Sequence, residues 1–368
     1  MNKMLLIISL FLLLFLTAYP ANAQDILRQR EDVFLRAEEI LQGMSLKEKV
    51  GQLFLARYPG SGALDMVKNY HIGGLNFFAG DFKNHDASSL RKRNATLQEA
   101  SSIPLLIGVD EEGGTVARVS RHKAFRAEKF RSPRALFKEG GIPRIVEDAK
   151  EKSELLLSLG INFNMAPVAD ISTSSSDFIY SRSLGQDAET TSLYVASVVE
   201  TMNQCGIASA IKHFPGYGSN RDTHNGVARD KRPYDSFATR DFLPFQAGIE
   251  AGAGCIMFSH NIVKCMDAKR PASLSPKIHR ILREELGYTG VIMTDSLSMD
   301  AITKFARKKS AAVMAVRAGN DLLCVKEFTK HYKAVLAAVK KGIIDESRID
   351  ESVRRILIWK LDLGIIPS

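Results

Sequence analysis

The chain is poor in cysteine and lacks the motifs that hold zinc or a phosphate-bearing cofactor. Its 368 residues include four cysteines, and none of them shows the CxxC spacing of a metal site. Neither a GxxxxGKS/T loop nor a dinucleotide-binding GxGxxG occurs. We therefore expect no metal and no cofactor. One disulfide is open to the chain in an oxidising compartment, while Cys255 and Cys324 lie in strand-like runs typical of buried thiols.

A long hydrophobic run occurs only at the N-terminus. Lys3 precedes the run MLLIISLFLLLFL, and small residues follow at Ala21-Asn22-Ala23. This pattern predicts a secretory signal peptide over residues 1–23, cleavage before Gln24, and a mature domain over 24–368. The alternative is an uncleaved membrane anchor, but the run is shorter than the roughly 20 residues of a spanning helix. The sequence thus predicts an exported protein, periplasmic or extracellular, without a membrane span after cleavage.

Charge of one sign is not concentrated anywhere in the sequence. The formal net charge is +9, but lysines and arginines are scattered among acids and form no aromatic-interleaved patch. This distribution, together with export, argues against nucleic acid as a partner. A basic exported protein is instead expected to associate electrostatically with anionic cell-wall polymers. The hydrophobic fraction of 45% and the charged fraction of 25% are those of a globular protein.

Short apolar runs alternate with helix-like segments along the whole chain. Apolar residues recur at spacings of three and four in 144–160 and 192–206, which predicts amphipathic helices. Several of the apolar runs are nearly continuous, as expected for strands buried on both faces of a parallel sheet. The eight predicted strands are 50–56, 73–79, 104–110, 161–170, 207–214, 255–261, 291–296 and 321–325.

Eight such strands predict an α/β fold of the (β/α)₈ TIM-barrel type. We expect a single domain, in which the residues after 325 form closing helices. A doubly wound open sheet is the competing interpretation. No internal repeat or linker divides the chain.

The ends of the predicted strands carry polar and charged residues. Any strand must end in a polar environment, so one such residue indicates little. In a barrel, however, the carboxyl ends of all strands meet at one face, where active sites lie. The side chains that we expect to share one cleft are Asp110, Asp170, Lys212, His213, His260 and Asp295.

One glycine-rich loop, KHFPGYGSNRDTH over residues 212–224, carries most of the ionisable groups. It resembles the KHFPGHG…D-S-H loop of glycoside hydrolase family 3, in its β-N-acetylglucosaminidase branch. Other stretches match the family in the same order, and together they cover nearly all of the mature chain. They are MSLKEKVGQLF (44–54), GVDEEGGTVARV (108–119), NFNMAPVADI (162–171), YSRSLGQD (180–187) and GVIMTDSLSMDAI (290–302).

The match to the family is not complete. The loop has Tyr217 where histidine is usual and Thr223 where serine is usual. Glu111 stands where glutamine is common, and Thr294 and Ser296 replace serine and aspartate beside the nucleophile position. None of these positions is assigned a chemical role, although Tyr217 bears on how the loop closes.

The resemblance implies three catalytic residues. Asp295 is the nucleophile that attacks the anomeric carbon, and retention of configuration then requires a proton donor. The family match assigns that task to His224, oriented by Asp222 as an aspartate orients the histidine of a serine-protease triad. Histidine titrates near neutrality, so one imidazole can protonate the leaving oxygen and then deprotonate water.

The resemblance also implies a set of sugar-binding residues. An alternative for Arg118 is an ion pair with Glu111 or Glu112, two carboxylates that we interpret as supporting residues. A rival mechanism would pair Asp110 with these glutamates and use the substrate's acetamido group as nucleophile. It would leave Asp295 and the loop dyad without a role. The implied binding residues are Asp110, Arg118, Arg182, Lys212 and His213.

These features predict an exported, retaining β-N-acetylhexosaminidase. Its expected substrate is terminal β-N-acetylglucosamine on small oligosaccharides, chiefly muropeptides derived from peptidoglycan. The alternatives are a β-glycosidase of other specificity, a β-N-acetylglucosaminide phosphorylase, and a non-catalytic glycan-binding protein. The sequence leaves open the aglycone (anhydro-muramyl, muramyl or chitin-like) and the oligomeric state.

Overall fold

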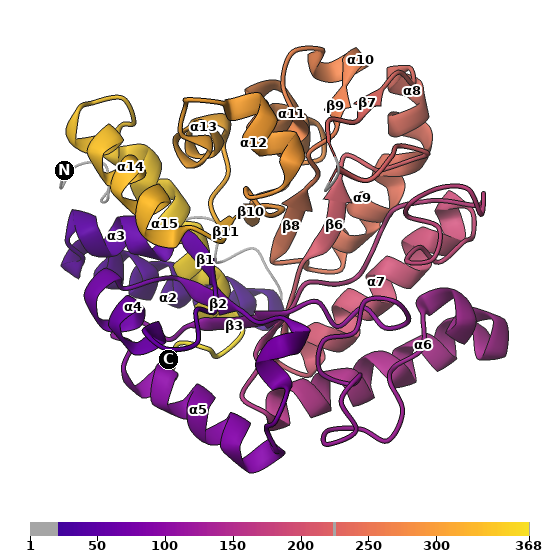
Figure 1. Ribbon diagram of the computed structural model, residues 1–368, viewed down its shortest axis with the longest axis horizontal. Helices are drawn as coiled ribbons and strands as arrows, with labels where there is room; N and C mark the ends of the chain where they lie inside the picture. The colour runs from indigo at the N-terminus through magenta and orange to yellow at the C-terminus, as the bar shows by residue number, and fades with distance from the viewer. Residues whose placement is uncertain (1–20, 224–225, 368) are drawn as a thin grey trace.

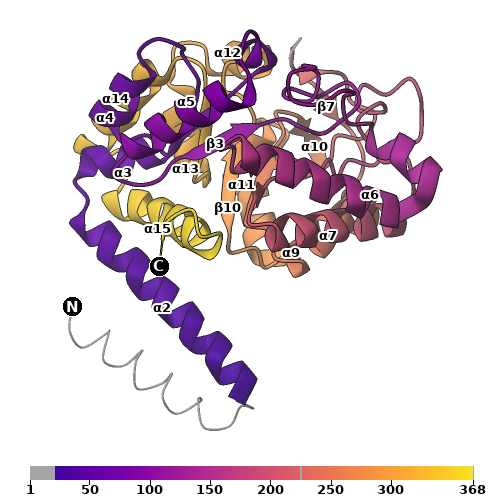
Figure 2. The ribbon, with the colours of Figure 1, turned by 90° about the horizontal axis from the view of Figure 1, so that it is seen from below.

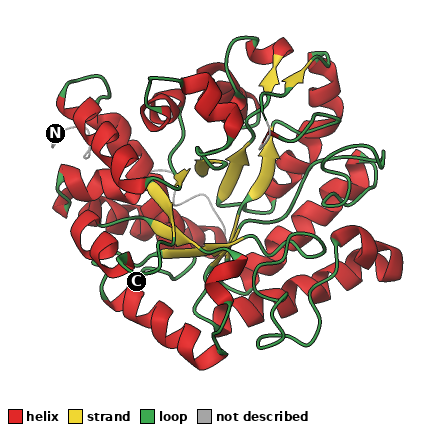
Figure 3. Cartoon of the chain, in the orientation of Figure 1, coloured by secondary structure: helices red, strands yellow, loops and turns green. Residues whose placement is uncertain are grey.

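The structure is a computed structural model that describes residues 21–223 and 226–367. Strands alternate with helices, and the helices lie outside the strands (Figure 1, Figure 3). No helix in these described ranges is long and apolar enough to cross a membrane. Most of the predicted signal peptide and the predicted proton donor His224 lie outside the described residues.

All the central strands run parallel, in two neighbouring sheets. The larger sheet has the order β11-β1-β2-β3-β4-β5 and the smaller one the order β10-β8-β6. The larger sheet consists of β1 (Phe54–Arg57), β2 (Gly74–Asn76), β3 (Leu106–Val109), β4 (Phe163–Asn164), β5 (Ala208–Ser209) and β11 (Leu323–Val325). The smaller sheet consists of β6 (Ile211–Phe214), β8 (Cys255–Phe258) and β10 (Val291–Thr294).

The two sheets approach each other at both of their edges. Isolated parallel bridges pair Val168 with Lys212 at one junction and Met293 with Leu322 at the other. At the first junction the predicted strand 207–214 is divided, because β5 pairs with β4 whereas β6 pairs with β8. The chain is therefore an α/β protein with parallel sheets, as the apolar runs predict. A further short parallel pair, β7 (Arg229–Asp230) with β9 (Ile262–Val263), lies beyond the ends of β6 and β8.

Helices follow most of the strands. The predicted helices 144–160 and 192–206 lie within α6 and α7 except for their last two residues, and two helices, α14 and α15, follow β11 as predicted. The longer helices are α2 (Ala21–Gly43), α3 (Leu46–Gln52), α4 (Ala63–Tyr70), α5 (Ala87–Glu99), α6 (Pro133–Ser158), α7 (Ala188–Gln204), α9 (Phe242–Glu250), α12 (Asp300–Ala306), α13 (Ala311–Ala318), α14 (Phe328–Lys340) and α15 (Glu346–Asp362). The shorter ones are α8 (Tyr234–Ser236), α10 (Lys264–Asp267) and α11 (Pro276–Arg280).

The first predicted strand, 50–56, is wrong over its first half. Val50 to Gln52 belong to helix α3, and β1 begins only at Phe54. The helix is set by a capping box, in which the Ser45 and Glu48 side chains each bond the other residue's backbone N–H. Where a run of apolar residues crosses from a helix into a strand, the run has no periodicity that marks the boundary between them.

The core has two layers. Inward-facing residues from both sheets, among them Leu55, Phe163 and Met293, form one buried cluster, and helix-facing residues form another. Helix α15 adds Trp359, whose ring packs edge-on against Phe163 at 5.3 Å between centroids. The neighbouring Lys360 is buried and donates from Nζ to Gln52 Oε1 and to the Gly73 carbonyl, each at 3.0 Å. Figure 2 shows α15 on the same side of the molecule as α2.

All four cysteines are free thiols, so the disulfide that the sequence left open does not form. Cys255 and Cys324 are buried, as predicted. Cys265 is exposed and Cys205 is half-buried.

Candidate active site

The strand-end residues lie where the parallel strands leave the two sheets. Asp110 follows β3 directly, Lys212 and His213 lie within β6, and Asp295 follows β10. The backbone N–H of Asp295 donates to the Phe258 carbonyl at 3.1 Å, which continues the β10–β8 ladder by one residue. The carboxylate of Asp295 also accepts from the backbone N–H of Ser296 at 2.6 Å. The predicted nucleophile is thus held by the end of a strand rather than by a free loop.

A buried cluster of alternating charges joins three of the connections after these strands. Lys212 Nζ lies 2.7 Å from Asp110 Oδ1 and 2.6 Å from Glu112 Oε1. Arg182 donates to both oxygens of Glu112, at 2.9 Å from Nε and 2.7 Å from Nη2. The Glu112 carboxylate therefore bridges the two cations, in the bidentate geometry that favours arginine.

These charges keep one another ionised. Burial opposes the charge on Lys212, but the carboxylates of Asp110 and Glu112 outweigh it and raise the lysine pKa. Burial likewise opposes the charge on Glu112, while Arg182 and Lys212 hold the pKa of that carboxyl well below its usual range. At neutral pH the cluster is a fixed array of donors and acceptors, suited to a ligand rich in hydroxyl groups.

Arg118 completes the cluster from the side of Asp110. Its Nη2 lies 3.7 Å from Asp110 Oδ2, and its guanidinium lies over the Phe78 ring at 5.6 Å from the centroid. The alternative ion pair of Arg118 with Glu111 or Glu112 is wrong. Glu111 accepts from the backbone N–H of Arg118 instead, at 2.7 Å.

Glu111 shapes the loop that carries Arg118. Its carboxylate accepts from three consecutive backbone N–H groups, those of Arg118, Val119 and Ser120, and from the Ser120 hydroxyl. Its own backbone N–H donates to Asn164 Oδ1 at 2.9 Å, on β4. These contacts agree with the supporting role expected for this glutamate, since no lone pair is left for a reaction.

Asp170 ties the end of β6 to the glycine-rich loop. Its Oδ2 accepts from His213 Nδ1 at 2.7 Å and from the His213 backbone N–H at 3.2 Å. Its Oδ1 accepts from the backbone N–H of Tyr217 at 2.7 Å. With Nδ1 donating to the aspartate, the other ring nitrogen of His213 accepts from Arg182 Nη2 at 3.3 Å. The sequence placed Asp170 at the end of the predicted strand 161–170 and assigned it no role. That position is wrong, because β4 ends at Asn164 and Asp170 lies in the connection that follows.

Tyr217 holds the far end of the same loop. Its buried phenol bonds the Thr223 hydroxyl at 2.7 Å and accepts from the Thr223 backbone N–H at 2.9 Å. Burial raises the pKa of the Tyr217 phenol, and the negative charges of Asp295 and Asp222 raise it further. The charges of the predicted nucleophile and of the predicted orienter thus both contribute to the environment of this phenol.

A clamp that the sequence did not reveal braces this loop from outside. Arg232 donates to Asp230 and Asp241, and to the Gly216 carbonyl at 3.3 Å. Gly216 has a φ of 118°, and a Cβ there would lie 2.8 Å from the Asp241 side chain. Gly218 has a φ of 55°, and a Cβ there would lie 2.6 Å from the Arg232 guanidinium. Both glycines are thus required by backbone conformation and close packing. In the sequence, the only indication of this clamp was the acidic Asp230 two positions before the basic Arg232.

His260 supports the nucleophile segment from β8. Its Nε2 lies 3.0 Å from the Ser296 carbonyl and its Nδ1 lies 2.7 Å from the Ser273 hydroxyl. Cys324 lies on the other side of this segment. Burial raises the pKa of its thiol to about 12, and the charges of Asp295 and Asp110 contribute to the rise. Cys324 therefore borders both the nucleophile and the charged cluster.

A cavity of about 370 Å³ opens beside these residues. Cys324 and Ser296 line it, together with the half-exposed ring of Phe78. An aromatic face next to hydroxyl and amide groups is a surface on which a sugar ring can lie. The remaining lining residues include Arg57, Asn76, Ser298, Met299 and Lys326.

Comparison with known proteins identifies the family. A model of the glycosyl hydrolase family 3 N terminal domain matches residues 45–358. The chain belongs to glycosyl hydrolase family 3. It is 30% identical over 327 residues to a curated β-hexosaminidase A of Pseudoalteromonas piscicida, a match that covers 81% of this chain and 55% of that protein.

Solved structures of family 3 proteins have the same fold. A family 3 β-N-acetylglucosaminidase from Paenibacillus has a TM-score of 0.83 and 32% identity, with 89% of this chain and 64% of that chain covered. A β-glucoside phosphorylase, BglX, bound to 2FGlc, has a TM-score of 0.82 and 25% identity, with 92% and 62% covered. This chain thus spans between half and two thirds of the length of these relatives.

The charged cluster connects all five of the binding residues expected from the family resemblance. Asp110, Arg118, Arg182 and Lys212 are directly linked, and His213 joins them through Arg182. Among the residues that the structure describes, no group of three or more histidines, cysteines and carboxylates is placed to hold a metal ion. The absence of a metal requirement stays a prediction for this family 3 chain.

Proposed function

We propose that this family 3 protein is a retaining β-N-acetylglucosaminidase that removes terminal, non-reducing β-N-acetylglucosamine. The observation that carries the proposal is that the predicted nucleophile and the charged cluster both lie toward the carboxyl ends of strands that run parallel. The Asp295 carboxylate lies at the end of β10, and the Asp110–Lys212 ion pair ends β3 and β6. Cys324 lines the neighbouring cavity, and the charges of Asp295 and Asp110 both contribute to the raised pKa of its thiol.

In this proposal the charged cluster binds the sugar. Asp110 accepts hydrogen bonds from ring hydroxyls, and Lys212, Arg182 and Arg118 donate to hydroxyls or to the acetamido carbonyl. His213, whose Nε2 accepts from Arg182, holds that guanidinium in place. All of these groups are held by ion pairs or hydrogen bonds before a ligand arrives. The binding geometry is therefore preorganised, and little side-chain entropy is lost when the sugar binds.

The reaction proceeds in two displacements. A carboxylate oxygen of Asp295 attacks the anomeric carbon while the bond to the leaving oxygen breaks, and His224 gives that oxygen a proton. The resulting neutral imidazole then takes a proton from water, whose oxygen attacks the same carbon and releases Asp295. Asp222 orients His224 and stabilises its charged form. The supporting observation is that the negative charges of Asp222 and Asp295 both contribute to the raised pKa of the Tyr217 phenol.

The cellular setting belongs to the same proposal. We infer export through the signal peptide over 1–23 and a mature chain that acts as one domain over 24–368. Muropeptides released from peptidoglycan are the proposed natural substrates. The bridges at both sheet junctions support closure of the strands into a (β/α)₈ barrel, whose carboxyl-end face then holds the site.

Phosphorolysis is the second candidate function, and one specific likeness favours it. The chain resembles in structure a β-glucoside phosphorylase, with a TM-score of 0.82. A proton donor that is neutral or cationic repels an incoming phosphate less than a carboxylate would. In that case phosphate, in place of water, attacks the glycosyl-enzyme, and the product is a sugar 1-phosphate. A non-catalytic glycan-binding protein remains the third alternative.

The deciding experiment is a substrate screen of the mature chain. Aryl β-N-acetylglucosaminides and aryl β-glucosides are each supplied with and without phosphate, and the released sugar is identified. The proposal expects free N-acetylglucosamine and no dependence on phosphate. A 2-deoxy-2-fluoro or 5-fluoro glycoside should add its sugar mass to the peptide containing Asp295, and Asp295→Ala should abolish this labelling. Labelling on Asp110 or Glu111 would refute the assignment, and sugar 1-phosphate as the main product would establish the phosphorylase.

A further inference from the structure

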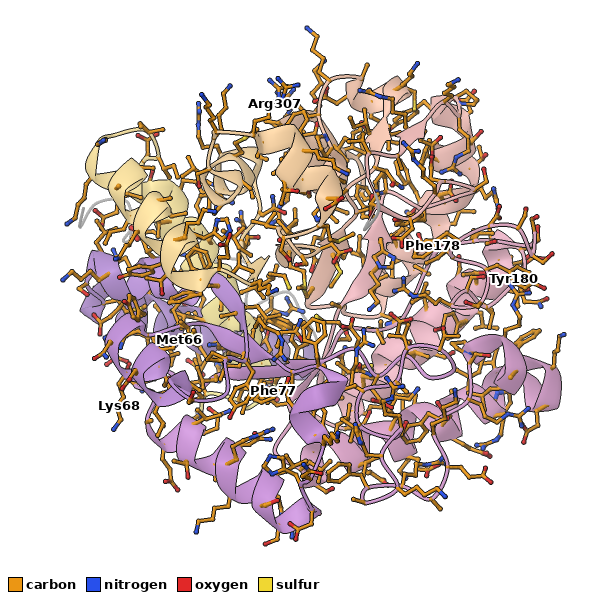
Figure 4. The ribbon with its side chains drawn as sticks, in the orientation of Figure 1. Met66, Lys68, Phe77, Phe178, Tyr180 and Arg307 are labelled. Atoms are coloured by element: carbon orange, nitrogen blue, oxygen red, sulfur yellow. The ribbon has the colours of Figure 1, made fainter. Side chains whose placement is uncertain are left out.

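A second depression, distinct from the cavity beside Asp295, lies between three connections on the strand-end side of the molecule. It has a volume of about 760 Å³. Its walls come from the segments that follow β6, β8 and β10, which contribute Val227 and Arg229, Ile262 and Lys269, and residues 304–309. Figure 4 labels Arg307, the residue that directly follows α12. We call it the basic groove.

The basic groove carries a concentrated positive charge. Six cationic side chains line it, and all six residues are exposed. In the ranges that the structure describes, only Lys304 has a carboxylate partner, Asp300, at 2.6 Å. The six are Arg229, Lys269, Lys304, Arg307, Lys308 and Lys309.

The end of a helix accounts for only part of this charge. Cations near the carboxyl end of α12 complement its dipole, which is a sufficient reason for Lys304 and Arg307. Arg229 lies on β7, where no helix end requires it, and Lys269 follows the short helix α10 on a third connection. Three segments far apart in the sequence thus place like charges around one depression. The mutual repulsion costs free energy unless a ligand compensates it.

The position of the basic groove points to one part of the substrate. The connection after β6 carries the proposed proton donor, and Arg229 follows it by a few residues. The connection after β10 begins with Asp295 and ends in residues 304–309. In the proposed mechanism the proton donor contacts the leaving oxygen, so we expect the connection that carries it to border the leaving group rather than the N-acetylglucosamine.

We propose that the basic groove binds the carboxylate groups of an acidic, peptide-bearing leaving group. This inference rests on the proposed function and names the substrate class that the site prefers. Cations spread over three connections suit several separated carboxylates along an extended chain, because each can meet a different lysine or arginine. Lysines on flexible stems tolerate variation in where those carboxylates lie.

The first test uses two double variants with the same change in net charge. Lys308→Gln with Lys309→Gln neutralises the basic groove. Lys340→Gln with Lys341→Gln is the matched control, because both lysines are exposed and lie at the far end of α14. Each protein is assayed on an aryl β-N-acetylglucosaminide, on an N-acetylglucosaminyl-muramyl peptide, and on the same peptide with its carboxylates amidated.

The groove variant should lose roughly three- to ten-fold in kcat/KM on the acidic peptide substrate, from two exposed ion pairs. It should keep its activity on the aryl glycoside and on the amidated peptide, and the control variant should match the wild type on all three. The wild-type preference for the acidic over the amidated peptide should shrink as salt is added. An equal loss on all substrates, or no preference in the wild type, overturns the inference.

A second test separates the inference from the proposed function. Binding of the free muramyl peptide, the product that carries the carboxylates, is measured by calorimetry and needs no turnover. Weaker binding by the groove variant alone supports the inference even if the enzyme proves to be a phosphorylase. Equal binding by all three proteins overturns it. The inference is also overturned if the groove variant differs from the wild type only in weaker retention on a phosphate-rich wall polymer. In that case the basic groove would be a surface that docks the protein on the wall. Failure of the proposed function appears elsewhere, as absent turnover of the aryl glycoside and absent labelling of Asp295.

Discussion

The phenolic oxygen of Tyr217 lies 2.7 Å from the hydroxyl oxygen of Thr223. These are the two positions at which the glycine-rich loop differs from the family 3 loop that it resembles. The two departures are therefore partners of each other, and together they close the loop over six residues. A longer side chain at 217 and an added methyl group at 223 fill the space inside the loop, and the Thr223 backbone N–H is bonded as well.

Removing this contact should impair catalysis through the position of the loop. Tyr217→Phe deletes the hydroxyl that takes part in two hydrogen bonds and leaves the buried Thr223 N–H without a partner, which costs about 1–3 kcal/mol. We expect kcat to fall while the KM for an aryl β-N-acetylglucosaminide changes little. Thr223→Val should lower kcat less, since the hydrogen bond from the Thr223 backbone N–H to the Tyr217 phenol survives. The double variant should be no worse than Tyr217→Phe, and strict additivity of the two effects would contradict the coupling.

The proposed dyad makes a separate prediction about leaving groups. His224→Ala should be costly for substrates with poor leaving groups and much less costly for activated aryl glycosides, which need little protonation to depart. Asp222→Ala should show the same pattern more mildly, because the imidazole remains but is less well oriented. The double variant should resemble His224→Ala, since residues that act as a unit are not additive. A loss that is equal for good and poor leaving groups in both half-reactions would assign the proton donor to another residue.

Gly216 should be intolerant of a side chain for a reason that concerns packing. Alanine at φ 118° is strained, and its Cβ would lie 2.8 Å from the Asp241 side chain, which the Arg232 clamp holds in place. Gly216→Ala should therefore lower both the free energy of unfolding and kcat. Gly206→Ala is the control, since that glycine also has a positive φ but meets nothing within 4 Å. If both substitutions have the same effect on kcat, the contact with Asp241 has no importance for the loop.

Asp321 should be a major source of stability at the other end of the strands. Its carboxylate accepts from Arg283, Arg348 and Arg355 at 2.8, 3.2 and 3.1 Å, and is fully buried. Asp321→Asn leaves three cations without their common partner, and the loss should be about 3 kcal/mol of unfolding free energy. Denaturant unfolding measures it. The exposed Glu327→Gln is the comparison, and a loss there as large as at Asp321 would contradict the importance of the buried carboxylate.

Lys360 should make stability depend on pH in the alkaline range. Burial lowers the pKa of its ammonium to about 7, and the groups to which it donates, the Gln52 side chain and the Gly73 carbonyl, are uncharged. The unfolded chain keeps the proton up to about pH 10.4. Between these values the unfolded state binds more protons than the folded state, so folding gains stability as pH rises, by about 1.4 kcal/mol per unit.

Lys360→Met removes the titrating group and should remove that gain. The difference in unfolding free energy between wild type and variant should shift in favour of the wild type from pH 7 to pH 10, and stay constant below pH 6. The exposed Lys340→Met serves as the reference for an ordinary lysine. A difference that does not change with pH would show that the Lys360 ammonium stays protonated inside the fold.

Local patterns predicted the kinds of element better than their limits. Helices α6 and α7 are both present where apolar residues recur at three and four, because an amphipathic period reports directly on a buried face. The first strand was wrong over Val50–Gln52, where a capping box at Ser45 starts a helix inside an apolar run. The division of 207–214 at Ala210 was equally invisible, because it depends on which neighbour each half pairs with.

The sequence by itself determined the order of strands and helices and the residues that stand at the strand ends. The pattern of apolar residues and its periodicity depend on a few consecutive residues, so both can be recognised in the sequence. Only the tertiary structure decided that Lys212 pairs with Asp110, 102 positions away, that Glu112 bridges Lys212 and Arg182, and that Arg118 bonds no glutamate side chain. For Arg118 it is the guanidinium that pairs with Asp110 and with no glutamate, whereas its backbone N–H donates to Glu111. Such pairings depend on the adjacency of parallel strands and on distances of a few ångströms, because charges interact strongly only where burial excludes water.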